Sequence, residues 1–187
     1  MDNKSLNFVK VWGAILRGGN RYYTYFDDVF ASLNDFQKNY NWLITDFEAY
    51  PQYLTYRNKL YSNNQYAWLS GDELTEMVYG EKFQWVWAVL SGFDKNYELE
   101  EILKYPYPGA DGYKGFWEPE LSIQHPFASV ELVAFDSGAT LFFTKDYKMY
   151  LEYMKSNPEA KDLQKFNTKI DDSEEYLEYW KKQESNQ

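Results

Sequence analysis

A continuous apolar run near the middle of the chain is the feature that most limits the possible folds. Residues 83–90 are almost all large and apolar, and the run has the length of one strand. Such a run is typical of a strand that is buried on both faces, in the interior of a sheet. The longest apolar stretch, residues 83–93, is far shorter than the roughly 18 apolar residues of a membrane span.

Four further segments show strand patterns, and apolar residues at steps of three and four predict several helices. The strands are expected over residues 8–16, with a turn at 18–20, and over 42–47, 129–135 and 139–144. The last two form a hairpin that turns at Asp136-Ser137-Gly138. Helices are expected over residues 23–39 and 52–60, over 147–157 with Tyr147, Tyr150, Leu151 and Met154 on one face, and from about Ser173.

Two further helices are predicted from their first residues. Ser70 and Glu73 have the spacing of a capping box, in which each side chain satisfies the other's backbone N–H, and Gly80 is suited to end that helix. Asn96 is the expected cap of a short helix whose residues Leu99 and Ile102 face inward.

The organisation of the chain favours one domain. The 187 residues fit one large domain better than two small ones, and the sequence has no internal repeat or low-complexity linker. We therefore predict a single α+β domain over residues 1–187, in which a mixed or antiparallel sheet of about five strands packs with about five helices. Residues 184–187 are expected to form a frayed tail.

Residue types that are missing exclude several kinds of chemistry. The chain has no cysteine, which excludes disulfides, thiolate zinc sites and a cysteine nucleophile. Its single histidine, His125, precedes Pro126 and is expected to be an ordinary loop side chain rather than a catalytic base. No catalytic residue, metal site or cofactor is predicted. The first residues lack the pattern of a signal peptide, so a cytoplasmic location is expected, or secretion by a route that leaves no such signal.

Negative charge is concentrated in the central third of the chain. The net charge is −10, and residues 71–136 hold 13 Asp and Glu against 4 Lys, a net of −9. This distribution argues against direct binding of nucleic acid or of anionic membranes, both of which need a basic surface. It would steer a basic protein toward the chain, although a negative surface also serves solubility alone.

The same region holds a long loop rich in aromatic residues. Aromatics make up 21% of the chain, too many for all of them to be fully buried. Residues 105–120 combine rings and carboxylates with proline and glycine, and long irregular segments are often functional. Alternatively, the loop folds back and its rings cover the core. The predicted partner-binding residues are Glu98, Glu100, Glu101, Tyr105, Tyr107, Asp111, Tyr113, Phe116, Trp117, Glu118 and Glu120.

In character the chain resembles the immunity proteins of bacterial toxin systems. The features that carry this resemblance are Trp42-Leu43-Ile44, the 130–135 strand followed by Asp136-Ser137, and the aromatic acidic loop. The resemblance implies a non-enzymatic bacterial protein that binds a cognate toxin, often a basic nuclease, and blocks it. Immunity proteins share no single fold, so no site residue can be transferred from them.

Two other functions are compatible with the sequence. Glu118 and Glu120 lie near Trp117 in the sequence, which suggests a carbohydrate-active enzyme. Such an enzyme would need two suitably separated carboxylates beside a ring that stacks on sugar. Alternatively, regular rows of carboxylates could mimic nucleic acid and inhibit a DNA-binding enzyme. A pocket with two converging acids would favour the enzyme, and an exposed acidic face with rings would favour the binding protein.

Overall fold

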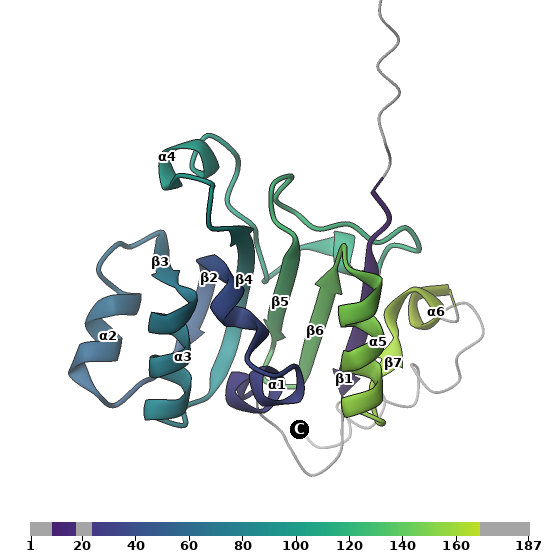
Figure 1. Cartoon of the computed structure of the whole chain (residues 1–187), viewed down its shortest axis with the longest axis horizontal. Helices are drawn as coiled ribbons and strands as arrows, with labels where there is room; N and C mark the ends of the chain where they lie inside the picture. The colour runs from purple at the N-terminus through teal and green to yellow at the C-terminus, as the bar shows by residue number, and fades with distance from the viewer. Residues whose placement is uncertain (1–8, 18–23, 169–187) are drawn as a thin grey trace, which may run out of the picture.

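A single antiparallel sheet organises the computed structural model, which describes residues 9–17 and 24–168. The sheet has seven strands in the order β3-β2-β4-β5-β6-β1-β7 (Figure 1). Along the chain the elements, with 3-10 helices written η, are β1 (Trp12–Arg17), α1 (Phe26–Ser32), η1 (Phe36–Asn39), β2 (Tyr40–Ala49), α2 (Leu54–Leu60), β3 (Tyr66–Ser70), α3 (Gly71–Gly80), β4 (Trp85–Asp94), α4 (Leu99–Ile102), η2 (Lys114–Trp117), β5 (Val130–Phe135), β6 (Ala139–Thr144), α5 (Tyr147–Ser156), β7 (Lys161–Asp162) and α6 (Leu163–Thr168).

The predicted α+β class is confirmed, but the expected number of strands is too low. The sequence patterns missed β3 and the two-residue β7, and they also missed α6. In β3, Ala67 and Leu69 face one layer of the core while Tyr66 and Trp68 lie against the other. Because both faces of this strand are apolar, it lacks the alternation of polar and apolar residues that identifies a half-exposed strand.

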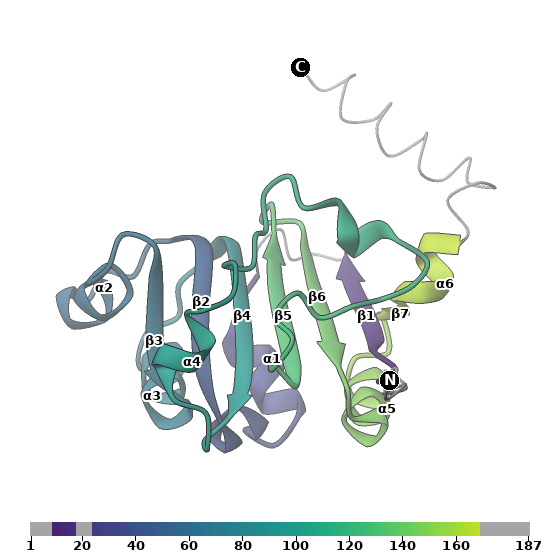
Figure 2. The ribbon, with the colours of Figure 1, turned by 90° about the horizontal axis from the view of Figure 1, so that it is seen from above.

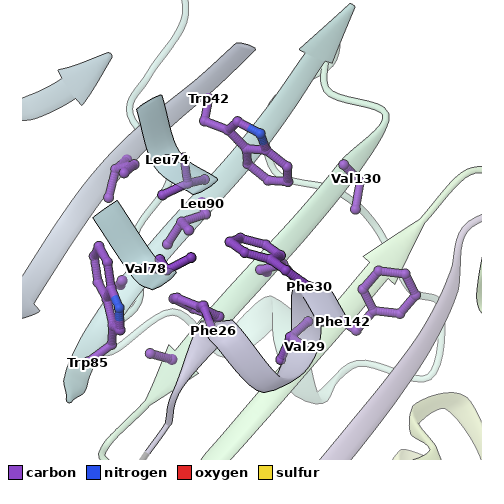
Figure 3. Packing of buried hydrophobic residues seen from close by; sticks show 14 of the residues in the cluster. Phe26, Val29, Phe30, Trp42, Leu74, Val78, Trp85, Leu90, Val130 and Phe142 are labelled. Atoms are coloured by element: carbon purple, nitrogen blue, oxygen red, sulfur yellow. The ribbon is translucent and has the colours of Figure 1, made fainter. Parts of the chain in front are cut away.

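Helices cover one face of the sheet and form the helical layer, made of α1, α3 and α5. Its buried residues join those of the strands in one core cluster, part of which Figure 3 shows between α1, α3 and the sheet. Phe30 is fully buried and lies 6.2 Å from the Trp42 ring, measured between centroids. On α5, Tyr153 stacks on Phe142 at 4.5 Å.

An irregular segment covers the other face, and we call residues 95–129 the covering segment. In Figure 2 it runs in front of the strands, with α4 and η2 as its only helical turns, while α1 and α3 lie behind the sheet. Together with α6 it buries a second core cluster that includes Val89, Val133 and Phe143. The strands β4 and β5 are therefore covered on both faces, which for β4 the apolar run of residues 83–90 predicted.

Two local predictions are confirmed in detail. The Ser70 hydroxyl accepts a hydrogen bond from the Glu73 N–H at 3.2 Å, and the Glu73 carboxylate accepts one from the Ser70 N–H at 3.0 Å. The hairpin turns at Asp136 and Ser137, which both have positive φ (45° and 55°), as a type I′ turn requires.

The helix predicted over residues 23–39 is wrong, because the chain interrupts it after one short helix. Asn34 and Asp35 adopt left-handed conformations with φ of 52° and 57°, and a 3-10 turn follows. Asn and Asp tolerate this conformation better than other residues that carry a side chain. The Asn34-Asp35 pair could therefore have indicated the end of the helix, but the apolar residues on either side of it continue the helical spacing.

The predicted faces and caps of two other helices need correction. On α5, Tyr147 and Leu151 are 49% and 47% exposed, and Tyr150 and Tyr153 are the buried pair. The N-cap residue of helix α4 is Glu98, not Asn96 as predicted. Asn96 lies in the turn before the helix, where its backbone N–H donates to the Asp94 carboxylate. The predictions for Phe8, the turn at 18–20, the helix from Ser173 and the tail at 184–187 lie outside the described residues.

Candidate functional site

All eleven predicted partner-binding residues lie on the covering segment, and nine of them form two groups over different strands. Near α4, the Tyr105 ring contacts the His125 ring, which lies 4.7 Å from Phe93 of β4. Near η2, the Phe116 ring lies 5.8 Å from Phe143 of β6 and beside Phe135 of β5. The segment therefore crosses the sheet between the two groups (Figure 2).

We name the first group the α4 surface. Its three carboxylates and two tyrosines are all exposed, with Tyr105 at 37% and Tyr107 at 39%. The α4 surface consists of Glu98, Glu100, Glu101, Tyr105 and Tyr107.

The second group, the η2 surface, is less accessible. It consists of Tyr113, Trp117, Glu118 and Glu120, whose rings are half-buried and whose carboxylates are exposed. Phe116 belongs to neither surface because it is 1% exposed and part of the core, so here the loop does fold back on the sheet.

The Trp117 side chain is half-buried and packs against the core. Its ring packs edge-on against Phe135 at 5.1 Å and also contacts Phe166 of α6. Only part of the indole is therefore available to a partner or to a sugar ring, and truncating it would remove packing as well as any binding contact.

A bulge in β2 anchors the middle of the covering segment. The pairing of β2 with β4 shifts register between Thr45 and Glu48, and Asp46 in this bulge has a positive φ of 43°. The Asp46 carboxylate accepts hydrogen bonds from the N–H groups of Ala110 and Asp111. Bulges commonly re-aim a side chain in this way. Asp111, the remaining predicted residue, is thus exposed beside this anchor rather than within either surface.

Gln124 anchors the segment a second time, deeper in the layer. Its side-chain amide exchanges two hydrogen bonds with Gly109, accepting from the N–H at 2.9 Å and donating to the carbonyl at 3.0 Å. Its backbone N–H and its side chain both donate to the carboxyl group of Glu131 on β5, at 3.2 Å and 3.4 Å. Glu131 is fully buried, and burial raises the pKa of its carboxyl to about 7.

His125 is buried beneath the covering segment, and both of its ring nitrogens take part in hydrogen bonds. It is 1% exposed, its Nε2 lies 3.1 Å from the Ile102 carbonyl, and its Nδ1 accepts from the Phe127 N–H. These contacts require the neutral form with the proton on Nε2, and burial lowers the pKa of the ring in the same sense. Both nitrogens are occupied, so neither is available for proton transfer.

Helix α6 binds the covering segment at η2 and at the residues that follow it. The Asn167 amide donates to the carbonyls of Phe116 and Glu118, at 2.9 Å and 2.8 Å, and the Gln164 amide donates to that of Pro119. The covering segment is thus irregular in shape but tied to the sheet and to α6 at several points.

The acidic region of the sequence does not form one surface. Asp72 and Glu76 lie on α3 in the helical layer, whereas the exposed acids of residues 98–120 lie on the opposite side of the sheet. The covering segment alone carries six exposed carboxylates and three lysines, a net charge of −3. None of its carboxylates forms an ion pair with another residue that the structure describes.

Sequence reasoning missed three residues on which the site depends: Asp46, Gln124 and Glu131. For Glu131 a signal existed, because alternation along β5 places it on the same face as Val133, which is buried. For Asp46 and Gln124 no local pattern exists, since their partners lie 64 and 15 residues away along the chain.

Across residues 9–17 and 24–168, no three His, Asp or Glu side chains gather closely enough to hold a metal ion. In the same part of the chain, none of the helices has the length and apolar character needed to cross a membrane. Comparison with known proteins found no family, no curated protein and no solved structure that matches this chain.

Proposed function

We propose that the chain is a non-enzymatic binding protein of the inhibitor or immunity type, which neutralises a basic protein partner, such as a toxin, through the α4 surface. The observation that carries the proposal is a set of exposed carboxylates without ion pairs beside exposed tyrosines that are held in place. Tyr105 contacts both His125 and Phe127, at 5.1 Å and 5.0 Å between ring centroids. A surface that is ordered before binding loses less entropy when the complex forms.

The chemistry of the α4 surface favours a partner rich in Lys and Arg. Glu98 and Glu100 can each accept charge-assisted hydrogen bonds, because no described residue neutralises them. Tyr105 and Tyr107 offer apolar area and possible cation–π contacts to the same partner. The η2 surface offers less, since its rings are half-buried.

The proposal is tested by capturing partners from the source cell at low salt and measuring their association rates. The variant Glu98→Lys/Glu100→Lys should slow association with a basic partner and flatten its dependence on salt. The matched control is Glu118→Lys/Glu120→Lys, which makes the same charge change on the η2 surface and should have the smaller effect. Tyr107→Ala should mainly speed dissociation.

Unchanged kinetics in the α4 double variant would rule out the α4 surface. A partner that binds the α4 and η2 double variants equally slowly would indicate only general attraction to negative charge. Hydrolysis of a sugar substrate that depends on Glu118 or Glu120 would point to the carbohydrate-active alternative. Capture of a DNA-binding enzyme that needs both surfaces would favour nucleic-acid mimicry.

A further inference from the structure

Glu131 is the most unusual group beneath the covering segment. Glu131 lies on β5, where it pairs directly with Ser91 of β4 on one side and with Phe143 of β6 on the other. Its side chain is fully buried, and both of its hydrogen bonds come from Gln124 of the covering segment. The carboxyl therefore lies at the junction between the sheet and the segment that covers it.

Ser91 supplies a second observation at the same place. It pairs directly with Glu131 across the two strands, and its hydroxyl is buried without a hydrogen-bond partner. Side chains of directly opposed residues lie within contact range. No hydrogen bond joins the Ser91 hydroxyl to the Glu131 carboxyl, so this donor does not compensate an ionised Glu131, whose side-chain donors are the two N–H groups of Gln124.

Charged groups from the surrounding elements do not compensate an ionised Glu131. Asp46 is bound to the Ala110 and Asp111 N–H groups, and His125 is neutral and bound to Ile102. The Lys145 ammonium donates to the Pro126 carbonyl at 3.0 Å. Burying a carboxylate with two N–H donors and no cation is costly, so the protonated form is favoured.

We propose that Glu131 is a proton-dependent anchor: its protonated carboxyl holds the covering segment on the sheet, and its ionisation loosens the segment that carries the α4 surface. The two Gln124 N–H groups favour the ionised carboxyl, but its full burial outweighs them. Opening of the segment would return an ionised Glu131 to water, and Gln124 links this place to Gly109 in the middle of the segment. The effect on partner binding rests on the proposed function of the α4 surface. The effect on the segment itself does not.

The anchor is tested on the full chain by hydrogen exchange of the Gly109 and Ala110 amides, in the wild type and in Glu131→Gln. The glutamine keeps the shape of the protonated acid and cannot ionise. Exchange of these amides gives, for each protein, the equilibrium constant for opening of the segment. The constant of the wild type divided by that of the variant should rise about tenfold between pH 6 and pH 8. Titration of His125 affects both proteins equally and cancels in this ratio. A constant ratio would overturn the proposal.

A matched control and a direct titration complete the test. Glu120→Gln removes an exposed carboxyl from the same segment and should behave as the wild type does. In NMR, the Glu131 carboxyl carbon should titrate near pH 7 in the wild type, well above the ordinary value of 4.5. This reading does not depend on how well Glu131→Gln folds. A midpoint near 4.5 in the wild type would also refute the anchor.

Partner binding separates this inference from the proposed function. If the partner binds Glu98→Lys/Glu100→Lys as well as the wild type, the proposed function fails while the exchange result stands. If the α4 surface binds the partner but the exchange ratio stays constant, the anchor fails alone.

Discussion

The two layers that cover the sheet are built by different means. In the helical layer, regular helices bury large rings such as Phe30 against Trp42. Buried polar contacts there are few, such as the hydrogen bond from the Gln37 amide to the Thr75 hydroxyl. The covering segment also buries rings, but its course is set by side chains that bond to distant backbone groups, as Asp46 and Gln124 do. The contrast shows that an irregular layer can be well anchored when polar side chains replace the hydrogen bonds of regular structure.

The largest effect is expected from removing a ring of the helical layer. Phe30→Ala should lower the free energy of unfolding by about 3–5 kcal/mol, because it leaves a cavity in the core. Phe116→Ala removes an equally buried ring beneath the covering segment. It should cost less, since the segment can open locally without unfolding the sheet. Equal losses in denaturant titrations of the two variants would show that both layers unfold as one unit.

The next largest effect concerns pH. The pKa of Glu131 is raised to about 7 in the folded chain, above its ordinary value of 4.5, so the folded state binds this proton more tightly. Its contribution is therefore complete below about pH 4.5, declines as the pH rises toward 7 and is lost above it. Glu131→Gln should be more stable than the wild type at pH 8, relative to pH 4, by about 3 kcal/mol.

His125 works in the opposite direction within an overlapping range. Burial lowers its pKa below the ordinary 6.5, so stability is lost as the pH falls below that value. In Glu131→Gln, the melting temperature should therefore fall as the pH is lowered from 8 to 5, and it should lack the decline toward high pH that Glu131 causes in the wild type. If the variant's stability instead declined with rising pH as the wild type's does, another group would be responsible.

A smaller and more local effect is expected at the bulge in β2. Asp46→Ala removes the acceptor for two N–H groups and places alanine at a positive φ, which should cost about 2 kcal/mol. Exchange of the Ala110 and Asp111 amides should increase more than exchange in the helical layer. Asp46→Asn is the matched control, because asparagine tolerates this conformation and keeps an acceptor. A uniform increase across both layers would remove the distinction between them.

The smallest effect belongs to the helical layer and is purely local. Ser70→Ala should lower the free energy of unfolding by about 1 kcal/mol through loss of the α3 cap. Ser70→Thr should retain most of the cap. If Ser70→Ala changed exchange in the covering segment as strongly as Asp46→Ala does, the two layers would be coupled through the sheet.

The sequence by itself determined features whose causes lie within a few residues. The α3 cap, the hairpin at Asp136-Ser137 and the doubly covered strand β4 all follow from short patterns. The concentration of rings and carboxylates in residues 98–120 is likewise a property of the sequence. The patterns failed where a local signal was overridden, as at Asn34-Asp35, or where both faces of a strand are apolar, as in β3.

Only the tertiary structure decided which of those residues face outward. It buried Phe116, left Tyr105 and Tyr107 exposed, and divided the acidic region between two sides of the sheet. It also joined Asp46 to Ala110 and Gln124 to Glu131, contacts that no spacing in the sequence encodes. The physical reason is that burial and long-range hydrogen bonds depend on which segments pack together, whereas caps and turns depend only on neighbouring residues.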